Sequence, residues 1–416
     1  MKCKQIVKRI LPDEIICAAK LVITKLNNRR MVREYRNIKN FNFQSHPKGI
    51  NLIGDIKAET GLGQSMRILA HMLKASGINF NVYQIDVYQN LEQSENEWDD
   101  KVKSDAEWGI NLIHVNPGEW AKTYIKLNRN ILDKRYNIAF WLWELEEFPK
   151  EWIPCIDTVD EIWTPSEFIS SGIRKVTDKP VITVPYAINY LTKEIYDRNY
   201  FGLPKDKFLF LTMYDAISVS ERKNPKAAIK AFKQAFSPQE DNIGLIIKVN
   251  HLKNKEELSE LKKELEAYPN IYYIDRNLTR REIESLVADA NVLVSLHRAE
   301  GFGLPIAEAM YVGTPVVATN WSAITEFTDE KSACLVDYTL VKLDKNIGPY
   351  KKGNRWAEAD IMDAASYMRK LYENKEYYDT LEKNGRKKIR EELCSHNTCK
   401  IIKERTEMIY EKNSIH

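Results

Sequence analysis

The chain has 416 residues, a length that predicts two domains rather than one hydrophobic core. Its 62 basic and 59 acidic side chains nearly cancel, so no overall field attracts nucleic acid. Hydrophobic and charged fractions of 44% and 29% are those of an ordinary soluble globular protein.

The cysteines and the apolar runs narrow the class of protein further. Six cysteines, at 3, 17, 155, 334, 394 and 399, fit no common zinc spacing, and we expect them to be reduced thiols in the cytoplasm. No apolar run reaches the roughly 18 residues that span a bilayer. Pro12, Asp13, Glu14 and Lys20 interrupt any signal-peptide core, so we expect no secretion.

The first forty residues are strongly basic, with eleven Lys or Arg against three acidic residues. Within them Ile15, Ala19, Val22 and Leu26 recur at helical spacing. We therefore predict a basic helical segment over residues 1–48. Such a helix can lie on an anionic membrane surface through residues 1–40, or pack as a solvated lead-in on the first domain, and the pattern favours neither.

Residues 49–195 predict a first Rossmann-like domain. Its first two strands, at 50–53 and 80–85, flank a loop at 54–63 and a helix that ends at Gly77. The loop contains Gly61 and Gly63, and Asp86 stands where a dinucleotide fingerprint places its ribose-binding carboxylate. Met66 replaces the third glycine of that fingerprint, and its side chain would obstruct close helix–strand packing.

Three more strands are predicted in this domain, at 110–115, 137–143 and 181–184. His114 ends the first of them and is a candidate for the site, although a histidine at a strand end is as often structural. Trp141 and Trp143 are expected in the core. The acidic cluster Glu144, Glu146 and Glu147 can bind hydroxyls, but an exposed charge run explains it better.

Tyr190–Lys207 is predicted to be a hinge, because its Gly202, Pro204 and mixed charges interrupt both the helix and the strand periodicity. Residues 205–390 then repeat the alternation of strand and helix, which predicts a second parallel, doubly wound sheet. The predicted strands are 208–213, 244–249, 271–274, 292–296 and 316–318, and the predicted helices are 224–236, 256–268 and one that starts with a capping box of Thr279 and Glu282. A charged helical tail follows, assigned to 391–416.

The stretch after the strand at 292–296 carries the clearest chemistry. Its glycines remove side chains where a ligand can touch backbone N–H groups, and Pro305 suits the start of a short helix that Gly313 ends. Such a helix amino end binds phosphate or diphosphate. Glu300 in the loop and Glu308 in the first helical turn cannot attract an anion, but they accept sugar or ribose hydroxyls. Together, the helix amino end and the two carboxylates predict a binding site for a sugar nucleotide.

Two cations are predicted at the same edge of the second sheet. Arg222 and Lys223 follow the strand at 208–213, and they can neutralise a diphosphate without a metal. A merely structural role is weakened because cations are disfavoured beside a helix amino end. Lys248 also ends a strand on this edge, with no evident role.

Glu300, seven intervening residues and Glu308, within E-G-F-G-L-P-I-A-E-A-M-x-x-G-T-P-V-V-A-T, resemble the E-x7-E signature of glycosyltransferase family 4, whose members have the GT-B fold and retain anomeric configuration. The resemblance implies that Glu300 contacts the donor sugar and Glu308 the nucleotide ribose. It also implies that the backbone of Gly301, Phe302, Gly303 and Leu304 holds the sugar and diphosphate.

The same resemblance implies that residues 49–195 form the acceptor domain and residues 205–390 the nucleotide-sugar donor domain, and it gives roles to other candidates. Gly61 and Gly63 would let the first domain approach the donor diphosphate, and His114 would line the cleft. Many family members have G-R upstream of the lysine, where this chain has Tyr214-Asp215. Lys223 is therefore the first choice for the diphosphate, with Arg222 in place of the missing arginine.

Two further segments, W-L-W-E-L-E-E-F-P and D-E-I-W-T-P-S-E-F, resemble a subgroup of family 4 associated with bacterial surface polysaccharides. We therefore expect a GT-B fold of two Rossmann-like domains facing a cleft, with a C-terminal helix that crosses back to the first domain. The expected enzyme is a retaining hexosyltransferase that moves a sugar from a nucleotide-sugar donor to a saccharide or lipid-linked saccharide acceptor, in the cytoplasm and at the inner membrane face if the basic segment binds there.

No cofactor and no metal are expected, because Arg222 and Lys223 can neutralise the diphosphate. The polar stretch with Asp99-Asp100 is interpreted as a loop. Two other classes stay open. A non-catalytic GT-B subunit would bind acceptor or a partner transferase, and a nicotinamide-dependent oxidoreductase would use Gly61 and Gly63, although its third glycine is missing.

Overall fold

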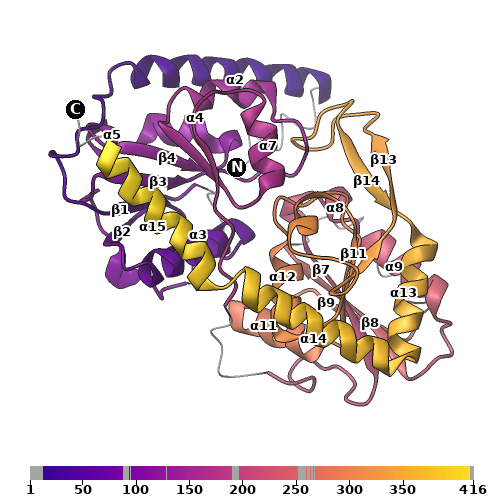
Figure 1. Ribbon diagram of the computed structural model, residues 1–416. Coiled ribbons are helices and arrows are strands. Elements are labelled where there is room, and N and C mark those ends of the chain that lie inside the picture. The colour runs from indigo at the N-terminus through magenta and orange to yellow at the C-terminus, as the bar shows by residue number, and fades with distance from the viewer. Residues whose placement is uncertain are drawn as a thin grey trace.

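The protein folds into two α/β domains, each built on one parallel sheet (Figure 1). This computed structural model describes residues 13–412 apart from 88–92, 94, 128, 190–195, 252–258, 260–262, 264, 265 and 267, with the side chains of 13–21 and 217 also left out. Residues 1–12 of the basic segment, the start of the predicted hinge and most of the predicted helix 256–268 lie outside the described residues.

The first sheet has six parallel strands in the order β2-β1-β3-β4-β5-β6. Helices cover both faces, which is why β1 and β3 are buried along their whole length. The strand order reverses between β1 and β3, where ligands of such sheets bind. The strands are β1 (Ile50–Gly54), β2 (Phe80–Gln84), β3 (Ile110–His114), β4 (Tyr136–Phe140), β5 (Glu161–Thr164) and β6 (Val181–Thr183), and the helices are α3 (Gly61–Ala75), α4 (Pro117–Lys126), α5 (Arg129–Leu132), α6 (Ile153–Ile156) and α7 (Glu167–Arg174).

Two local expectations for this domain were wrong. The strand predicted at 137–143 ends at Phe140, although Trp141 and Trp143 are buried as expected. Met66 does not obstruct helix packing, because Gly54 at the end of β1 makes room for it. A Cβ on Gly54 would lie 2.8 Å from the Met66 sulfur. The close approach of helix and strand therefore comes from a glycine in the strand.

The second sheet also has six parallel strands, in the order β12-β11-β10-β7-β8-β9. Its order reverses between β7 and β10, so the expected doubly wound fold is confirmed. The capping box of Thr279 and Glu282 starts α11 as predicted. The elements are β7 (Phe208–Asp215), α8 (Ser220–Lys223), α9 (Pro225–Ala235), β8 (Ile243–Asn250), β9 (Ile271–Ile274), α11 (Arg280–Asp289), β10 (Val292–Ser295), α12 (Leu304–Val312), β11 (Val316–Thr319), β12 (Cys334–Val336) and α13 (Ile361–Glu373).

An antiparallel hairpin of β13 (Tyr338–Lys342) and β14 (Arg355–Ala359) projects from the second domain. Sequence periodicity gave no sign of it. Tyr350, in its loop, and Trp356 share a hydrophobic cluster with Trp143 and Trp152 of the first domain. The hairpin therefore joins the two domains on one side of the structure (Figure 1).

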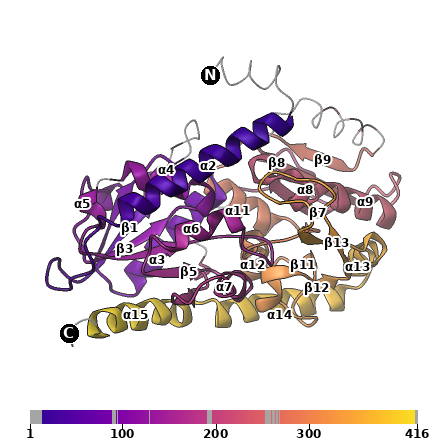
Figure 2. The same ribbon diagram turned by 90° about the horizontal axis from the view of Figure 1, so that it is seen from above.

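The basic segment forms α2 (Asp13–Tyr35), which lies along the first domain against α4 and α6 (Figure 2). Met31 is fully buried, whereas Val22, Ile23 and Leu26 are 56%, 54% and 57% exposed. The helix thus packs by its C-terminal half and leaves an apolar patch in solvent. Among the helices of the described residues, none is long and apolar enough to cross a membrane.

The chain returns to the first domain through α14 (Lys375–Glu392) and α15 (Ser395–Lys412), as predicted (Figures 1 and 2). The two crossing segments run together where the Ile188 N–H donates to the Leu393 carbonyl at 2.8 Å. On the first domain, Arg405 of α15 forms a bidentate ion pair with the fully buried Glu161. The tail is therefore an integral part of the first domain's packing.

The Arg405→Met substitution should lower stability by about 3 kcal/mol, because removing one partner of a buried ion pair leaves an uncompensated charge. Glu161 would keep only Tyr136 and Trp163 as donors. Thermal unfolding measures the loss. The control is Lys400→Met on the same helix, whose pair with Glu404 is exposed and worth little. Equal melting temperatures for the two variants would contradict this role of α15.

Candidate active site

The site lies at the point where the strand order of the second sheet reverses. β7 and β10 are neighbours there, and the loops that follow their carboxyl ends carry the two groups of predicted residues. One loop presents Arg222 and Lys223 on α8, and the other presents Glu300 to Gly303 before α12. The sheet topology therefore brings together residues that are about eighty positions apart in the sequence.

Gly303 sets the amino end of α12. Its φ of 92° is in the left-handed region, and a Cβ there would lie 2.5 Å from Ile324. Within the described part of the chain, the backbone N–H groups of Gly301, Phe302, Gly303 and Leu304 meet no acceptor. Four consecutive donors, three of them on buried residues, are thus available at the amino end of a helix.

Glu300 is a buried carboxylate between two cations. Lys223 Nζ lies 2.5 Å from its Oε1, and Arg222 Nη1 lies 3.2 Å from its Oε2. Burial raises the pKa of Glu300, but Lys223 and Arg222 outweigh burial and hold it at about 2. The backbone N–H of Glu300 donates to Ser322 Oγ at 2.8 Å, and Ser322 has a φ of 66°. The carboxylate is therefore ionised and fixed in place.

The segment that presents the two cations is strained. α8 is one short turn between Val219, with a φ of 63°, and Asn224, with a φ of 52°. A β-branched residue at positive φ costs of the order of 1–3 kcal/mol and persists only when its surroundings enforce it. Arg222 supplies that support, because its guanidinium donates to the Ala299 carbonyl at 2.8 Å in the opposite loop.

Arg222 and Lys223 respond differently to the same surroundings. Burial lowers the pKa of the Arg222 guanidinium, but Tyr350, Glu300 and Glu144 raise it above its ordinary value. Burial lowers the pKa of the Lys223 ammonium, and Glu300 only partly restores it. Lys223 is the one of the two that also borders a small cavity, so it is better placed to meet a ligand.

Glu308 is paired with a residue that the sequence reasoning missed. The sequence analysis places Glu308 in the first helical turn. This prediction was wrong, because α12 begins at Leu304 and Glu308 lies beyond its first turn. Its carboxylate takes a bidentate pair of hydrogen bonds from Arg280, the first residue of α11. Burial raises the pKa of Glu308, and Arg280 opposes this. The available signal was Arg280 itself, a cation at a helix amino end.

His114 lies in a buried chain of polar groups on the first domain. Its Nε2 is 2.6 Å from Ser65 Oγ, which also bonds to the Tyr186 hydroxyl. Burial lowers the pKa of His114 to about 4, so its ring is neutral at physiological pH. The Tyr186 ring packs edge-on against Phe302 at 4.9 Å. His114 is therefore connected to the loop of Gly301 to Gly303 through the side chains of Ser65 and Tyr186.

The two glycines of the first domain differ in their surroundings. Both lie in the first turn of α3, which starts at Gly61, so the predicted loop ends earlier than Gly63. A Cβ on Gly63 would lie 2.0 Å from the Ala58 carbonyl, whereas a Cβ on Gly61 would meet nothing within 4 Å. Packing alone requires Gly63, while Gly61 faces open space.

Contacts from the first domain reach the glycine-rich loop directly. Ser166 Oγ donates to the Gly301 carbonyl at 2.7 Å, and a Cβ on Gly301 would lie 2.8 Å from the Trp143 carbonyl. The N–H groups of Glu167 and Phe168 donate to the Glu326 carboxylate. The domains are therefore in close contact around Glu300.

The acidic cluster belongs to this interdomain contact. Glu144 accepts from the Tyr350 hydroxyl at 3.1 Å and lies 3.8 Å from Arg222, while Glu146 pairs with Arg355. Glu147 is exposed. The expectation of an exposed charge run was thus wrong for Glu144 and Glu146, which are bound by the hairpin.

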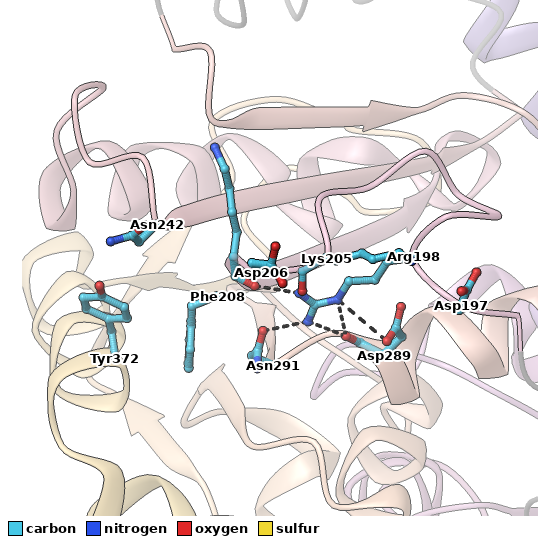
Figure 3. A pocket seen from close by; sticks show the side chains of 10 residues that line it. Asp197, Arg198, Lys205, Asp206, Phe208, Asn242, Asp289, Asn291 and Tyr372 are labelled. Atoms are coloured by element: carbon cyan, nitrogen blue, oxygen red, sulfur yellow. Dashed lines mark hydrogen bonds and ion pairs between the residues drawn. The ribbon is translucent and has the colours of Figure 1, made fainter.

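A small hollow and a larger one border the second sheet. The one beside Lys223, Glu300 and Gly303 has a volume of about 20 Å³, enough for a water molecule. A larger recess, of about 720 Å³, lies beside the amino ends of β7, β8 and β10, and Figure 3 shows the side chains that line it. The Arg198 guanidinium there donates hydrogen bonds to the carbonyls of Asp289 and Lys207 and to the Asn291 side chain. That recess anchors the linker and lies away from Glu300.

Metal sites in proteins are built from His, Cys, Asp and Glu side chains. Among the described residues, no group of three or more His, Cys, Asp or Glu side chains could hold a metal ion. Asp99 and Asp100 lie in a short 3-10 helix, Asp99–Lys101, rather than in a loop, and Asp99 pairs with Lys57 at 2.6 Å.

Comparison with known proteins gives the class of the fold. HepE from Anabaena, solved with UDP-glucose, has a TM-score of 0.61 at 12% identity over 87% of this chain and 100% of its own. Sucrose-phosphate synthase from Thermosynechococcus elongatus has a TM-score of 0.61 at 14% identity, over 88% and 100%. TarM from S. aureus, solved with UDP, has 0.52 at 14%, over 71% of this chain and 55% of TarM. This chain thus spans about half the length of TarM. The fold is GT-B, that of glycosyltransferases.

The family comparison is more specific. Residues 197–388 match the family described as "Glycosyl transferases group 1". This range contains Arg222, Lys223, Glu300 and Glu308, so the candidate site lies within the part of the chain that resembles this family. No curated protein matches the sequence.

The two glycines of α3 give a matched pair of substitutions. Gly63→Ala should lower the melting temperature by several degrees, because its Cβ would overlap the Ala58 carbonyl. Gly61→Ala should keep or slightly raise stability, because alanine is the better helix former and space is open. Thermal unfolding separates them. Equal destabilisation of both variants would contradict the packing assigned to Gly63.

Proposed function

We propose that the protein is a retaining hexosyltransferase of family 4, which moves a sugar from a nucleotide-sugar donor to a hydroxyl acceptor. The observation that carries the proposal is the set of N–H groups from Gly301 to Leu304, which meet no acceptor among the described residues and lie next to Lys223 and Glu300. A helix amino end and a cation suit a diphosphate, and carboxylates suit hydroxyls. The E-x7-E resemblance supports family 4.

In this proposal the diphosphate lies against the N–H groups of Gly301 to Leu304 and the Lys223 ammonium. Glu300 accepts hydrogen bonds from hydroxyl groups of the donor sugar, and Glu308 accepts hydrogen bonds from the ribose hydroxyls. No metal is required, because Lys223, Arg222 and the N–H groups stabilise the negative charge that builds on the leaving diphosphate. Preorganised donors of this kind need no rearrangement at the moment of reaction.

The chemical step follows from the charges. The bond between the anomeric carbon and the phosphate oxygen breaks, and a bond to the acceptor oxygen forms on the same face. The departing phosphate takes the proton of the acceptor hydroxyl, so the step is balanced in atoms and in charge. Glu300 does not supply this proton, because Lys223 and Arg222 keep it ionised. Its charge favours the positively charged, oxocarbenium-like transition state.

Substrate entry requires the domains to separate. The cavity of about 20 Å³ is far below the roughly 300 Å³ of a typical ligand pocket. The contact between Lys223 and Glu300 must also open for a diphosphate to reach Lys223. We propose that the first domain rocks away on the linker and α14–α15, and that closure restores the contacts around Gly301.

For the acceptor we propose a saccharide or lipid-linked saccharide of surface polysaccharide or glycolipid assembly, at the cytoplasmic membrane face. The exposed patch of Val22, Ile23 and Leu26 supports a membrane surface, because Lys25, Arg29 and Arg30 on the same helix are also exposed. Apolar side chains flanked by cations match an anionic lipid surface in both polarity and charge.

Glu300→Ala and Lys223→Ala should each reduce transfer from a nucleotide sugar by about 10²–10³-fold, because each removes an electrostatic contact to the reacting groups. Initial rates with UDP- and GDP-sugars, chosen by thermal shift, measure this. Lys230→Ala, an exposed lysine on α9, is the matched control. Wild-type rates in the first two variants would refute the site, and absence of turnover in the wild type would favour a non-catalytic subunit.

The triple substitution Val22→Ser, Ile23→Ser and Leu26→Ser should abolish flotation with vesicles of phosphatidylserine and phosphatidylcholine, because it removes the apolar contact and keeps the cations. Met362→Ser on α13 removes a comparably exposed side chain and should change nothing. Binding that persists in the triple variant, or that is absent from the wild type, would remove the membrane from the proposal.

A further inference from the structure

Arg280 occupies an unfavourable place in the helix that it begins. It is the first residue of α11, where the helix dipole disfavours a cation. The guanidinium is compensated by two buried carboxylates. Its Nε donates to Glu284 at 2.9 Å, and its two terminal nitrogens donate to the two oxygens of Glu308, one of them at 3.1 Å. A guanidinium retained against the dipole in this way indicates a specific task.

The backbone that carries Arg280 is fixed by the capping box. Thr279 Oγ accepts from the Glu282 N–H at 3.3 Å, and the Glu282 carboxylate accepts from the Thr279 N–H at 2.8 Å. Arg276 and Tyr200 also hold the Glu282 carboxylate. The start of α11 is therefore rigid, and Arg280 delivers its guanidinium to Glu308 from a defined position.

The surroundings of Glu308 contain few other charges. From α11 it faces Arg280 and Glu284, and burial and Glu284 both raise its pKa while Arg280 lowers it. On α14, Arg386 and Arg390 donate to carbonyls at the far end of α12. β10 and β11 contribute no titratable residue. From the first domain, Arg67 of α3 is close enough to Arg280 for their charges to repel each other. Arg280 is thus the cation bonded to Glu308.

We propose that Arg280 is a positioning residue, which holds the Glu308 carboxylate ionised and in one orientation so that it accepts both hydroxyls of the donor ribose. This inference rests on the proposed function. A bidentate guanidinium takes one lone pair from each oxygen, and each oxygen keeps another. Two acceptors held side by side match a vicinal diol. A lysine cannot replace this planar fork.

The first test measures KM for the donor against pH. In Arg280→Met, KM should rise about tenfold to hundredfold at neutral pH, since a buried carboxylate without its cation takes up a proton. KM should fall again as pH rises and Glu308 ionises, whereas the wild-type KM stays level. Arg281→Met, an exposed neighbour with the same change of charge, should behave as the wild type.

Two further variants separate positioning from folding. The triple variant Arg280→Met/Glu284→Gln/Glu308→Gln removes the cation and both of its carboxylates, so it leaves none of the three charges unpaired and should bind the donor no more weakly than Glu308→Gln alone. Arg280→Lys keeps the charge but not the fork, so it should lose most of the preference for ribose over 2′-deoxyribose donors. A purely structural Arg280 would leave that preference and the pH profile unchanged.

The outcomes distinguish this inference from the function on which it rests. A wild-type KM and pH profile in Arg280→Met overturns the positioning role alone. Donor binding in Glu308→Gln that equals that of the wild type, with the wild-type preference for ribose over 2′-deoxyribose intact, overturns the ribose contact and the positioning role together. A protein that binds neither UDP nor GDP in titration calorimetry overturns the proposed function as well.

Discussion

The buried contact of Glu300 with Lys223 and Arg222 is the interaction on which the site depends. A carboxylate with only 8% of its surface exposed is stable only beside cations and hydrogen-bond donors. This contact fastens the loop after β7 to the loop after β10, at the place where the sheet order reverses. The strained backbone at Val219 and Ser322 persists because these charges and their hydrogen bonds hold it.

The same charges connect the two domains. Arg222 lies between Glu300 of its own domain and Glu144 of the first, and Tyr350 of the hairpin binds Glu144. At the other end of the interface, α15 is bound to the first domain through Arg405 and Glu161. The interface between the domains is thus flanked by the hairpin on one side and the returning helix on the other, so any opening must break or stretch polar contacts at the site itself.

Most of the core architecture could be predicted from local patterns. Periodicity located β1, β7, β9 and β10 because a buried parallel strand is a short apolar run, and capping residues marked the start of α11. The hairpin β13–β14 was missed, because its strands alternate little in polarity and pair only with each other. The roles of Gly54 and Met66 were also missed, since their contact joins a strand end to a helix.

The sequence by itself determined two doubly wound domains, and it located the helix amino end with Glu300 and Lys223. These features depend on apolar periodicity and on residues close together in the chain. Only the tertiary structure decided which side chains face one another: Arg280 on Glu308, Glu144 beside Arg222, and His114 behind Ser65 and Tyr186. Each of these contacts joins elements that packing brings together, and no local pattern encodes the distance between them.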